Sequence, residues 1–258
     1  MSRGGLGTIL SMGPSPLPDE ARLDRERSDG HPQVMPPTLI LVPTEPERRL
    51  LEPRLSEGMR PGDRLELCGF GPVAAAARTA GLLATLVPGR VLLVGIAGRL
   101  DERLSLGYAY RFDRVACHGV GAGTGDAFLP AGSLGWRHWP GGDAGERGAI
   151  GDEIDCGRHS GAGANAAAGF LLTACAASAS TVDVLARRQL FPEAVAEDME
   201  GFAVALACRL AGVPLDIVRG ISNDAGDRDK ARWQVPAALK AAADLAVRLL
   251  GDPSVDVS

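Results

Sequence analysis

The stretch that decides the fold spans residues 194–233 and reads AVAEDMEGFAVALACRLAGVPLDIVRGISNDAGDRDKARW. Its pattern predicts the end of a strand, a cluster of carboxylates, a helix, a second strand and a polar loop, in that order. The helix begins at Gly201 with residues of high helix propensity, and Gly212 marks its end. The second strand is the run LDIVRGI, which leads into Ser222 and Asn223. Strand, helix and strand in succession are typical of an α/β fold.

A cluster of carboxylates fills residues 197–200, directly before the predicted helix. Acidic side chains in this position are often no more than a favourable charge at the positive end of the helix dipole. A second interpretation is functional. In a parallel α/β sheet the ends of successive strands open into one crevice where ligands bind, so the cluster is expected to lie near Ser222 and Asn223. A further acid, Glu47, follows another predicted strand, and this convergence of polar groups favours a functional site.

The rest of the chain alternates apolar runs with segments of helical pattern. Strands are predicted within 38–43, 64–71, 90–98, 107–111, 113–118 and 169–180. Helices are predicted at 45–55, 72–86, 181–190 and 235–250, and the glycine-rich segment 132–165 is predicted to be a solvated loop. This alternation predicts an α/β fold with a mainly parallel, twisted sheet.

Composition limits the classes of protein to consider. The 258 residues are 45% hydrophobic and carry a formal net charge of -5, which is typical of a globular protein and gives no basic surface for nucleic acid. Five widely spaced cysteines without a CxxC motif argue against a disulfide framework or a zinc site. No apolar run approaches the roughly 18 residues of a membrane span. We therefore expect a disordered extension at 1–36, a single domain at 37–252 and a cytoplasmic location.

Two motifs, EDMEG at 197–201 and ISNDAGDRDKARW at 221–233, resemble the nucleoside phosphorylase/nucleosidase superfamily. Within it they are most similar to the futalosine hydrolases of menaquinone biosynthesis. The resemblance runs from about residue 39 to residue 250 and is weak between residues 132 and 169. It implies a three-layer α/β/α sandwich on a mixed, mainly parallel sheet. It also implies a homo-oligomer that acts on a small-molecule nucleoside without a metal ion or an organic cofactor.

The resemblance also assigns roles to residues at the predicted edge of the sheet. The pattern from Thr44 to Glu47 is similar to the position where hydrolases of this superfamily hold the attacking water, although Glu47 could also be a plain first-turn acid. A carboxylate there would repel the phosphate that phosphorylases use. Glu200 is implied to accept hydrogen bonds from the ribose hydroxyls, and Met199 to pack against the sugar. The other residues implied to contact the nucleoside here are Ile96, Ala97, Gly98 and Asp198.

Asn223 is expected to meet the base. Asparagine keeps a permanent N–H donor and one carbonyl acceptor, which suits a 6-oxopurine such as hypoxanthine. Adenine-specific members of the superfamily have aspartate at this position. The alternative is a turn asparagine that bonds its own backbone, and Asp224 is a second candidate for the functional side chain.

The loop at 226–233 carries Arg228, Lys230, Arg232 and Trp233. A basic side chain such as Arg228 could meet a carboxylate of the substrate, and Trp233 could stack on an aromatic ring. Futalosine carries a carboxyphenyl group on its 5′ side, which would use both contacts. The alternative is a surface ion-pair loop in which the tryptophan anchors the last helix.

Together these features predict an N-glycosyl hydrolase that cleaves futalosine to hypoxanthine and dehypoxanthine futalosine. Three alternatives stay open from the sequence: a methylthioadenosine/adenosylhomocysteine nucleosidase, a purine nucleoside phosphorylase, and a non-catalytic nucleoside-binding protein of the same fold. A Rossmann dehydrogenase is disfavoured because the glycine pair at 69–71 lacks the third glycine of the dinucleotide motif.

Overall fold

The computed structural model describes residues 1, 36–142, 148–156, 165–167 and 169–251, and the structural statements below concern these residues. Most of the extension predicted to be disordered (1–36) lies outside them, as do parts of the segment 132–165. None of the helices in the described ranges is long and apolar enough to cross a membrane.

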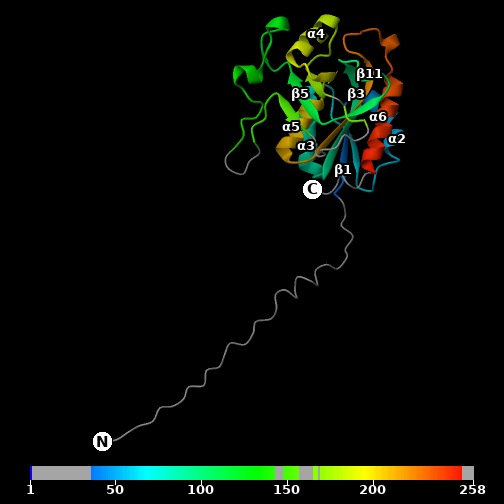
Figure 1. Cartoon of the computed structure of the whole chain (residues 1–258). Helices are drawn as coiled ribbons and strands as arrows, with labels where there is room; N and C mark the ends of the chain where they lie inside the picture. The colour runs from blue at the N-terminus through cyan, green and yellow to red at the C-terminus, as the bar shows by residue number, and fades with distance from the viewer. Residues whose placement is uncertain (2–35, 143–147, 157–164, 168, 252–258) are drawn as a thin grey trace. The chain divides into compact units, whose positions relative to one another are not determined.

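A mixed, mainly parallel sheet of nine strands forms the centre of the domain (Figure 1). Its strands are β1 (Thr38–Val42), β2 (Arg64–Leu67), β3 (Arg90–Arg99), β4 (Ala109–Phe112), β5 (Arg114–His118), β8 (Glu153–Asp155), β9 (Phe170–Ala174), β10 (Ala194–Asp198) and β11 (Leu215–Asp224). Their spatial order is β2-β1-β3-β10-β9-β5-β8, while β11 pairs with β3 and β4. The pairs β3–β10, β4–β11 and β5–β8 are antiparallel and the others are parallel, which confirms the predicted class of fold.

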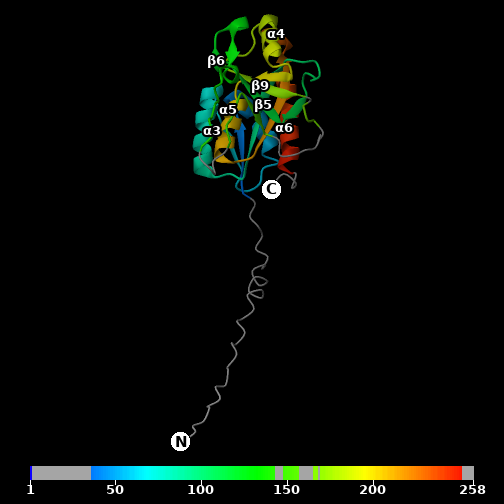
Figure 2. The same ribbon diagram turned by 60° about the vertical axis from the view of Figure 1, so that its left-hand side comes forward.

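Helices cover both faces of this sheet and complete three layers (Figure 2). They are α2 (Glu45–Leu55), α3 (Pro72–Leu86), α4 (Thr181–Leu190), α5 (Gly201–Ala211) and α6 (Val235–Leu250). The helices α3 and α5 pack on one hydrophobic cluster of the sheet, whereas α2 and α6 pack on the other. Strands covered on both faces consist mostly of apolar residues, and all five residues of β1 are buried accordingly.

Helix boundaries follow the local sequence closely. The helix α2 begins after Thr44, whose Oγ1 accepts the backbone N–H of Glu47 at 3.5 Å, and Pro46 lies in the first turn, where the missing N–H costs nothing. The helix α5 begins at Gly201 and ends at Gly212, which has a φ of 72° that favours glycine. The predicted boundaries of α5 are confirmed, so the carboxylates at 197–200 lie where β10 ends and α5 begins.

The arrangement around β3 leaves part of one strand edge without a strand partner. Along one edge of β3, β11 runs parallel over its whole length. Along the other edge, β1 pairs only as far as Leu93, and β10 joins only from Gly98. We call residues 94–97, between these points, the open edge of β3. Backbone groups on such an edge need partners from elsewhere, and diverging strands in α/β sheets commonly create the ligand site.

The segment 132–165 was predicted to be a solvated loop, but its described residues also include regular structure. The short strand β8 pairs antiparallel with β5, and a 3₁₀ turn spans Ala131–Leu134. Only Ile154 is buried among the three residues of β8, so the strand is too short to produce a period in the sequence.

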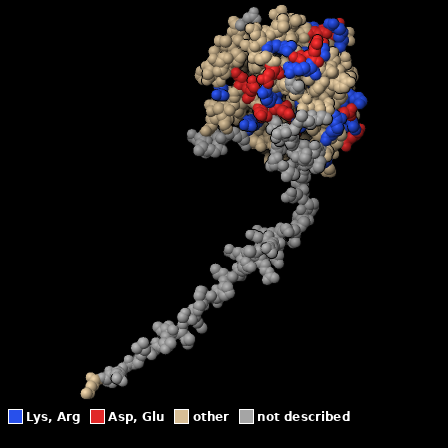
Figure 3. Space-filling model, in the orientation of Figure 1, with Lys and Arg blue, Asp and Glu red and all other residues tan. Residues whose placement is uncertain are grey.

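Charged side chains of both signs mix on the face of the molecule drawn in Figure 3, where no extended basic surface is visible. On α2 and α6 opposite charges pair directly: Asp244 accepts from Arg54 at 2.8 Å and from Lys240 at 2.8 Å. Pairs as exposed as these contribute little to stability, because solvent screens their charges. The surface of this face therefore agrees with the small negative net charge.

Candidate active site

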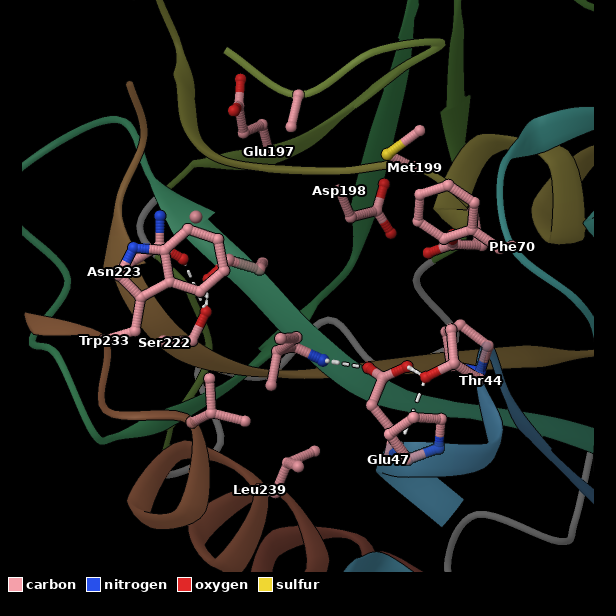
Figure 4. Close-up of a pocket in the computed structure, with 18 of the residues that line it drawn as sticks. Thr44, Glu47, Phe70, Glu197, Asp198, Met199, Ser222, Asn223, Trp233 and Leu239 are labelled. Atoms are coloured by element: carbon pink, nitrogen blue, oxygen red, sulfur yellow. Dashed lines mark hydrogen bonds between the residues drawn. The ribbon is translucent and has the colours of Figure 1, made fainter. Parts of the chain in front are cut away.

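A cavity of about 590 Å³ opens at the ends of β1, β3, β10 and β11 (Figure 4). Ten of the residues that the sequence suggested for the site line it. They are Glu47, Ile96, Ala97, Gly98, Asp198, Met199, Glu200, Asn223, Arg228 and Trp233. The ends of the parallel strands β1, β3 and β11 converge there as predicted, and β10, which is antiparallel to β3, ends at the same place.

Glu47 is fixed at the open edge of β3. Its side chain is buried, with 8% of the residue exposed. One carboxylate oxygen accepts a hydrogen bond from Thr44 Oγ1 at 2.6 Å, and the other accepts the backbone N–H of Ile96 at 3.1 Å. The carboxylate therefore satisfies an N–H group that no strand pairs, and it is held by both α2 and β3 (Figure 4).

Arg219 is the central charged residue that the sequence analysis missed. It lies inside β11, its side chain is fully buried, and it contacts Asp198 through Nε at 3.0 Å and Nη2 at 2.6 Å. Both hydrogen bonds end on the same oxygen, Asp198 Oδ2, so the two side chains form a close buried ion pair. The available signal was a lone arginine within the apolar run LDIVRGI, because a buried cation in a central strand requires a carboxylate partner.

Asp198 is already engaged within the protein. Its Oδ1 accepts from Thr173 Oγ1 at 2.6 Å, and its Oδ2 accepts the backbone N–H of Gly201 at 2.9 Å as well as the Arg219 guanidinium. Asp198 lines the cavity, as expected for substrate contact. Its hydrogen bonds, however, suit a residue that holds Arg219 and the start of α5 in place.

Glu200 lies on the same side of the cavity. Its Oε1 accepts the backbone N–H of Gly71 at 2.9 Å, and its Oε2 lies 3.5 Å from Arg219 Nη2. Burial raises the pKa of Glu200 to about 7, while the nearby arginine opposes that shift and the Asp198 carboxylate adds to it. The carboxylate can therefore change its charge near neutral pH.

One guanidinium nitrogen of Arg219, Nη1, is buried and has no hydrogen-bond partner among the described residues. It points toward the position of Gly95. A Cβ atom on Gly95 would lie 2.4 Å from Nη1 and 2.9 Å from Glu47 Oε1, so only glycine leaves room for both groups. An unpartnered N–H donor and a carboxylate oxygen therefore meet at the open edge of β3, which is an arrangement that can hold a small polar molecule between them.

Asn223 lies across the cavity from Glu47 (Figure 4). Its Nδ2 donates to the Asp224 carbonyl at 2.8 Å, and its Oδ1 accepts from Ser222 Oγ at 2.7 Å. The first of these contacts is the local backbone bond expected of a turn asparagine. Asp224, the second candidate, pairs with Arg99 at 2.6 Å, and its half-exposed side chain is not among those that line the cavity. Asn223 is therefore the better candidate for contact with a ligand.

The loop after β11 divides its basic residues between surface and cavity. Arg232 pairs with Asp227 at 2.8 Å and is largely exposed, as a surface ion-pair loop predicts. Arg228 and Lys230 line the cavity and form no ion pair within the described part of the chain. Trp233 also lines it, and its indole N–H donates to the Asp227 carbonyl at 3.1 Å. Two cations and an aromatic ring thus border one region of the cavity.

Apolar side chains supply much of the remaining wall, and no pattern in the sequence distinguishes them from core residues. They include Pro43, Leu50, Phe70, Val235 and Leu239. Phe70 and Leu50 are well exposed, at 66% and 54%, although both line the cavity. A largely apolar wall with a few convergent polar groups is typical of a small-molecule site.

Comparison with known proteins relates this geometry to a family. A model of the phosphorylase superfamily matches residues 64–251. Over 189 residues the chain is 33% identical to a futalosine hydrolase of Streptomyces coelicolor, a match that covers 70% of this chain and 75% of the relative. Over 158 residues it is 34% identical to a 5'-methylthioadenosine/S-adenosylhomocysteine nucleosidase of Marinomonas sp., covering 61% of this chain and 66% of the relative.

A solved structure agrees with the fold. The nucleosidase of the same name from Colwellia psychrerythraea, crystallised in complex with adenine, matches with a TM-score of 0.64 and 22% identity over 84% of this chain and 95% of that chain. The sequence relatives named above are N-glycosyl hydrolases, which confirms the predicted class of enzyme. The matched family model covers most of the chain, and this confirms the resemblance seen in the sequence. The chain therefore belongs to the phosphorylase superfamily.

Proposed function

We propose that this chain hydrolyses the N-ribosidic bond of futalosine and releases hypoxanthine and dehypoxanthine futalosine. The observation that carries the proposal is the Glu47 carboxylate at the open edge of β3, close to the free Nη1 of Arg219. A carboxylate in this place favours water as the nucleophile, because it would repel an incoming phosphate. The similarity to the futalosine hydrolase of Streptomyces coelicolor supports the choice of nucleoside.

Cleavage of an N-ribosidic bond builds positive charge on the ribose and negative charge on the departing base. In this proposal Glu47 and Arg219 Nη1 hold the attacking water, and Glu47 takes a proton as the water oxygen bonds to C1′. The electron pair of the C1′–N bond leaves with the base, which gains its proton from solvent. Glu200 accepts hydrogen bonds from the ribose hydroxyls, and in its ionised form its charge favours the cationic sugar. Met199 packs against the sugar.

Asn223 would recognise the base. When a nucleoside enters, its amide can exchange the Asp224 carbonyl for an acceptor on the purine, while the amide oxygen accepts from a ring N–H. This combination suits a 6-oxopurine. At the other part of the substrate, the cations of Arg228 and Lys230 would meet a carboxylate and Trp233 would stack on its ring, as the 5′ carboxyphenyl group of futalosine requires.

A methylthioadenosine/adenosylhomocysteine nucleosidase is the second candidate, and the relative from Marinomonas sp. favours it. Both candidates use the same carboxylates to activate water and stabilise the sugar. They differ in the base and in the 5′ group, so the decisive residues are Asn223 on one side and the pair Arg228 and Lys230 on the other. Methylthioadenosine has no carboxylate on its 5′ side, and the carboxylate of adenosylhomocysteine is aliphatic, so neither substrate would combine charge pairing with Arg228 or Lys230 and stacking on Trp233.

The test is the release of free base from futalosine, inosine and methylthioadenosine, each with and without phosphate. We expect hypoxanthine from futalosine at a rate that does not depend on phosphate. Adenine released from methylthioadenosine alone would transfer the proposal to the second candidate. Release only in the presence of phosphate would indicate a phosphorylase, and ligand binding without any release would indicate a nucleoside-binding protein.

We also propose that the chain forms a homo-oligomer in the cytoplasm and acts in menaquinone biosynthesis. Light scattering tests the assembly, since a monomer has a mass of 26.7 kDa. Loss of menaquinone after deletion of the gene, restored by the wild-type chain but not by Glu47→Gln, would test the pathway.

A further inference from the structure

The connection between β9 and α4 forms one wall of the cavity. We call its residues 175–180, with the sequence CAASAS, the strap. Ala177 and Ser178 of the strap line the cavity, yet the strap belongs to neither a helix nor a strand. Its small side chains offer little packing of their own, so its conformation depends on hydrogen bonds from neighbouring elements.

Glu197, at the end of β10, supplies two of these hydrogen bonds. Its Oε1 accepts the backbone N–H of Ser178 at 2.8 Å, and its Oε2 accepts from Ser178 Oγ at 2.7 Å. Glu197 is 4% exposed, and Figure 4 shows its carboxylate pointing away from the centre of the cavity. Successive side chains of a strand point to opposite faces, so β10 directs Asp198 to Arg219 and Glu197 to the strap.

Arg187, on α4, completes the arrangement. Its Nη1 donates to Ser178 Oγ at 2.9 Å and to the Glu197 carboxylate, and its Nη2 donates to the Ala176 carbonyl at 2.6 Å. Arg187 is itself buried, with 8% of the residue exposed. The buried pair therefore holds the strap on both sides of Ala177, and neither carboxylate nor guanidinium has a direct role in the chemistry proposed above.

The strap lies next to the region where the base is proposed to bind. The loop after Asn223 packs against its end, because a Cβ on Gly226 would lie 2.7 Å from the Ser180 backbone. Gly98, near the end of β3, lies between Glu197 and the residue after β11: a Cβ on Gly98 would lie 3.5 Å from Glu197 Cγ and 3.5 Å from Ala225 Cα. The strap, the end of β3 and the end of β11 thus enclose one end of the cavity.

We infer that Glu197 and Arg187 are positioning residues that fix the strap and thereby set the shape of the base-binding end of the cavity. The inference rests on the proposed function for the identity of that end. Loss of the Glu197 charge would leave Arg187 buried without its partner and free the Ser178 peptide, so the wall would sample several conformations. The consequence is weaker binding of the purine with little change in the chemical step, because Glu47, Glu200 and Arg219 are held by other contacts.

The experiment compares Glu197→Gln with the matched control Glu193→Gln. Glu193 lies four residues before Glu197, and its carboxylate forms an exposed ion pair with Arg114. Four quantities are measured at a temperature where circular dichroism shows folded protein. They are amide hydrogen exchange of the strap, the dissociation constant for hypoxanthine, and kcat and KM for the nucleoside that the wild type cleaves best. For Glu197→Gln we expect about tenfold faster exchange in the strap and about tenfold increases in KM and in the dissociation constant, as loss of one or two buried charged hydrogen bonds implies. We expect kcat within about threefold of wild type, and no change in the control.

Unchanged exchange, or faster exchange with KM and the dissociation constant within about twofold of wild type, would overturn the inference. If Glu197→Gln does not fold, Ser178→Ala replaces it, because that change removes the contacts of the hydroxyl with Glu197 and Arg187 without burying an unpaired charge. A KM at the wild-type value in Ser178→Ala would then be the contrary result. A wild-type chain that binds hypoxanthine but cleaves no nucleoside would refute the proposed function, while exchange and binding would still decide the role of Glu197.

Discussion

Replacement of Gly95 by alanine is the most direct probe of the site. The new methyl group would lie 2.4 Å from Arg219 Nη1, 2.9 Å from Glu47 Oε1 and 3.1 Å from Pro43 Cδ. Arg219 cannot retreat easily because two of its nitrogens bond Asp198. We therefore expect Glu47 to move away from the open edge of β3 and to lose its hydrogen bond from Ile96. The positioning of water would suffer, while the residues that bind the nucleoside stay in place.

The size of the effect follows from these distances. A displacement near 1 Å at a catalytic group costs about 100-fold in rate, so kcat/KM should fall by about two orders of magnitude. Overpacking of a buried site costs roughly 1–3 kcal/mol of unfolding free energy, and for a domain of this size each kcal/mol lowers Tm by roughly 2–4 °C. Base release measured under steady state and differential scanning calorimetry give both numbers.

Gly81→Ala is the matched control. Gly81 lies within α3, and a Cβ there would meet no atom within 4 Å. Alanine should stabilise the helix by up to about 1 kcal/mol and leave kcat/KM unchanged. A Gly95→Ala variant with wild-type kcat/KM would refute the argument that Arg219 and Glu47 must meet at this glycine.

Three further predictions concern the charged and polar groups of the cavity. Glu47→Gln should lower kcat by about 10²–10⁴-fold in the base-release assay while the variant stays folded by circular dichroism; a rate near wild type would exclude Glu47 as the base. Asn223→Asp should raise kcat/KM for methylthioadenosine relative to futalosine, and an unchanged ratio would place base recognition elsewhere. Because burial raises the pKa of Glu200 to about 7 in the free protein, kcat/KM should fall as pH drops below 7. Folded protein then holds a proton that the unfolded chain releases near pH 4.5, so the free energy of unfolding should decrease as pH rises from 4.5 to 7, and Glu200→Gln should flatten this slope in urea titrations.

The strands and helices were largely predictable because most of them are simple in physical terms. β1 is buried on both faces and therefore reads as a continuous apolar run, and α5 carries its end signal in Gly212. β1, β3 and β11 run parallel, so the meeting of Glu47 and Asn223 at one edge of the sheet followed from their places in the sequence. Glu200 reaches the same edge for another reason, because β10 runs antiparallel to β3 and ends where β3 ends. β8 escaped prediction because three residues with one buried side chain make no pattern.

The partners of the carboxylates could not be predicted in the same way. Asp198 was expected to contact the substrate, but its oxygens face Arg219 and Thr173, which lie 21 and 25 residues away in the chain. Glu197 likewise contacts Arg187 only because tertiary packing places α4 next to the end of β10. A side chain in a strand has its direction set by alternation, but its partner is set by which element covers that face, and this depends on tertiary packing.

At the open edge of β3, the group proposed to activate water does not belong to the sheet. Neither β1 nor β10 pairs with residues 94–97. The side chain that fills this gap, Glu47, comes from the first turn of α2. Substitutions in that turn can change the side chain that contacts the attacking molecule without disturbing any strand pairing. The turn between Thr44 and Glu47 can therefore present a different side chain to the molecule that attacks the sugar, while the pairing of the sheet stays the same.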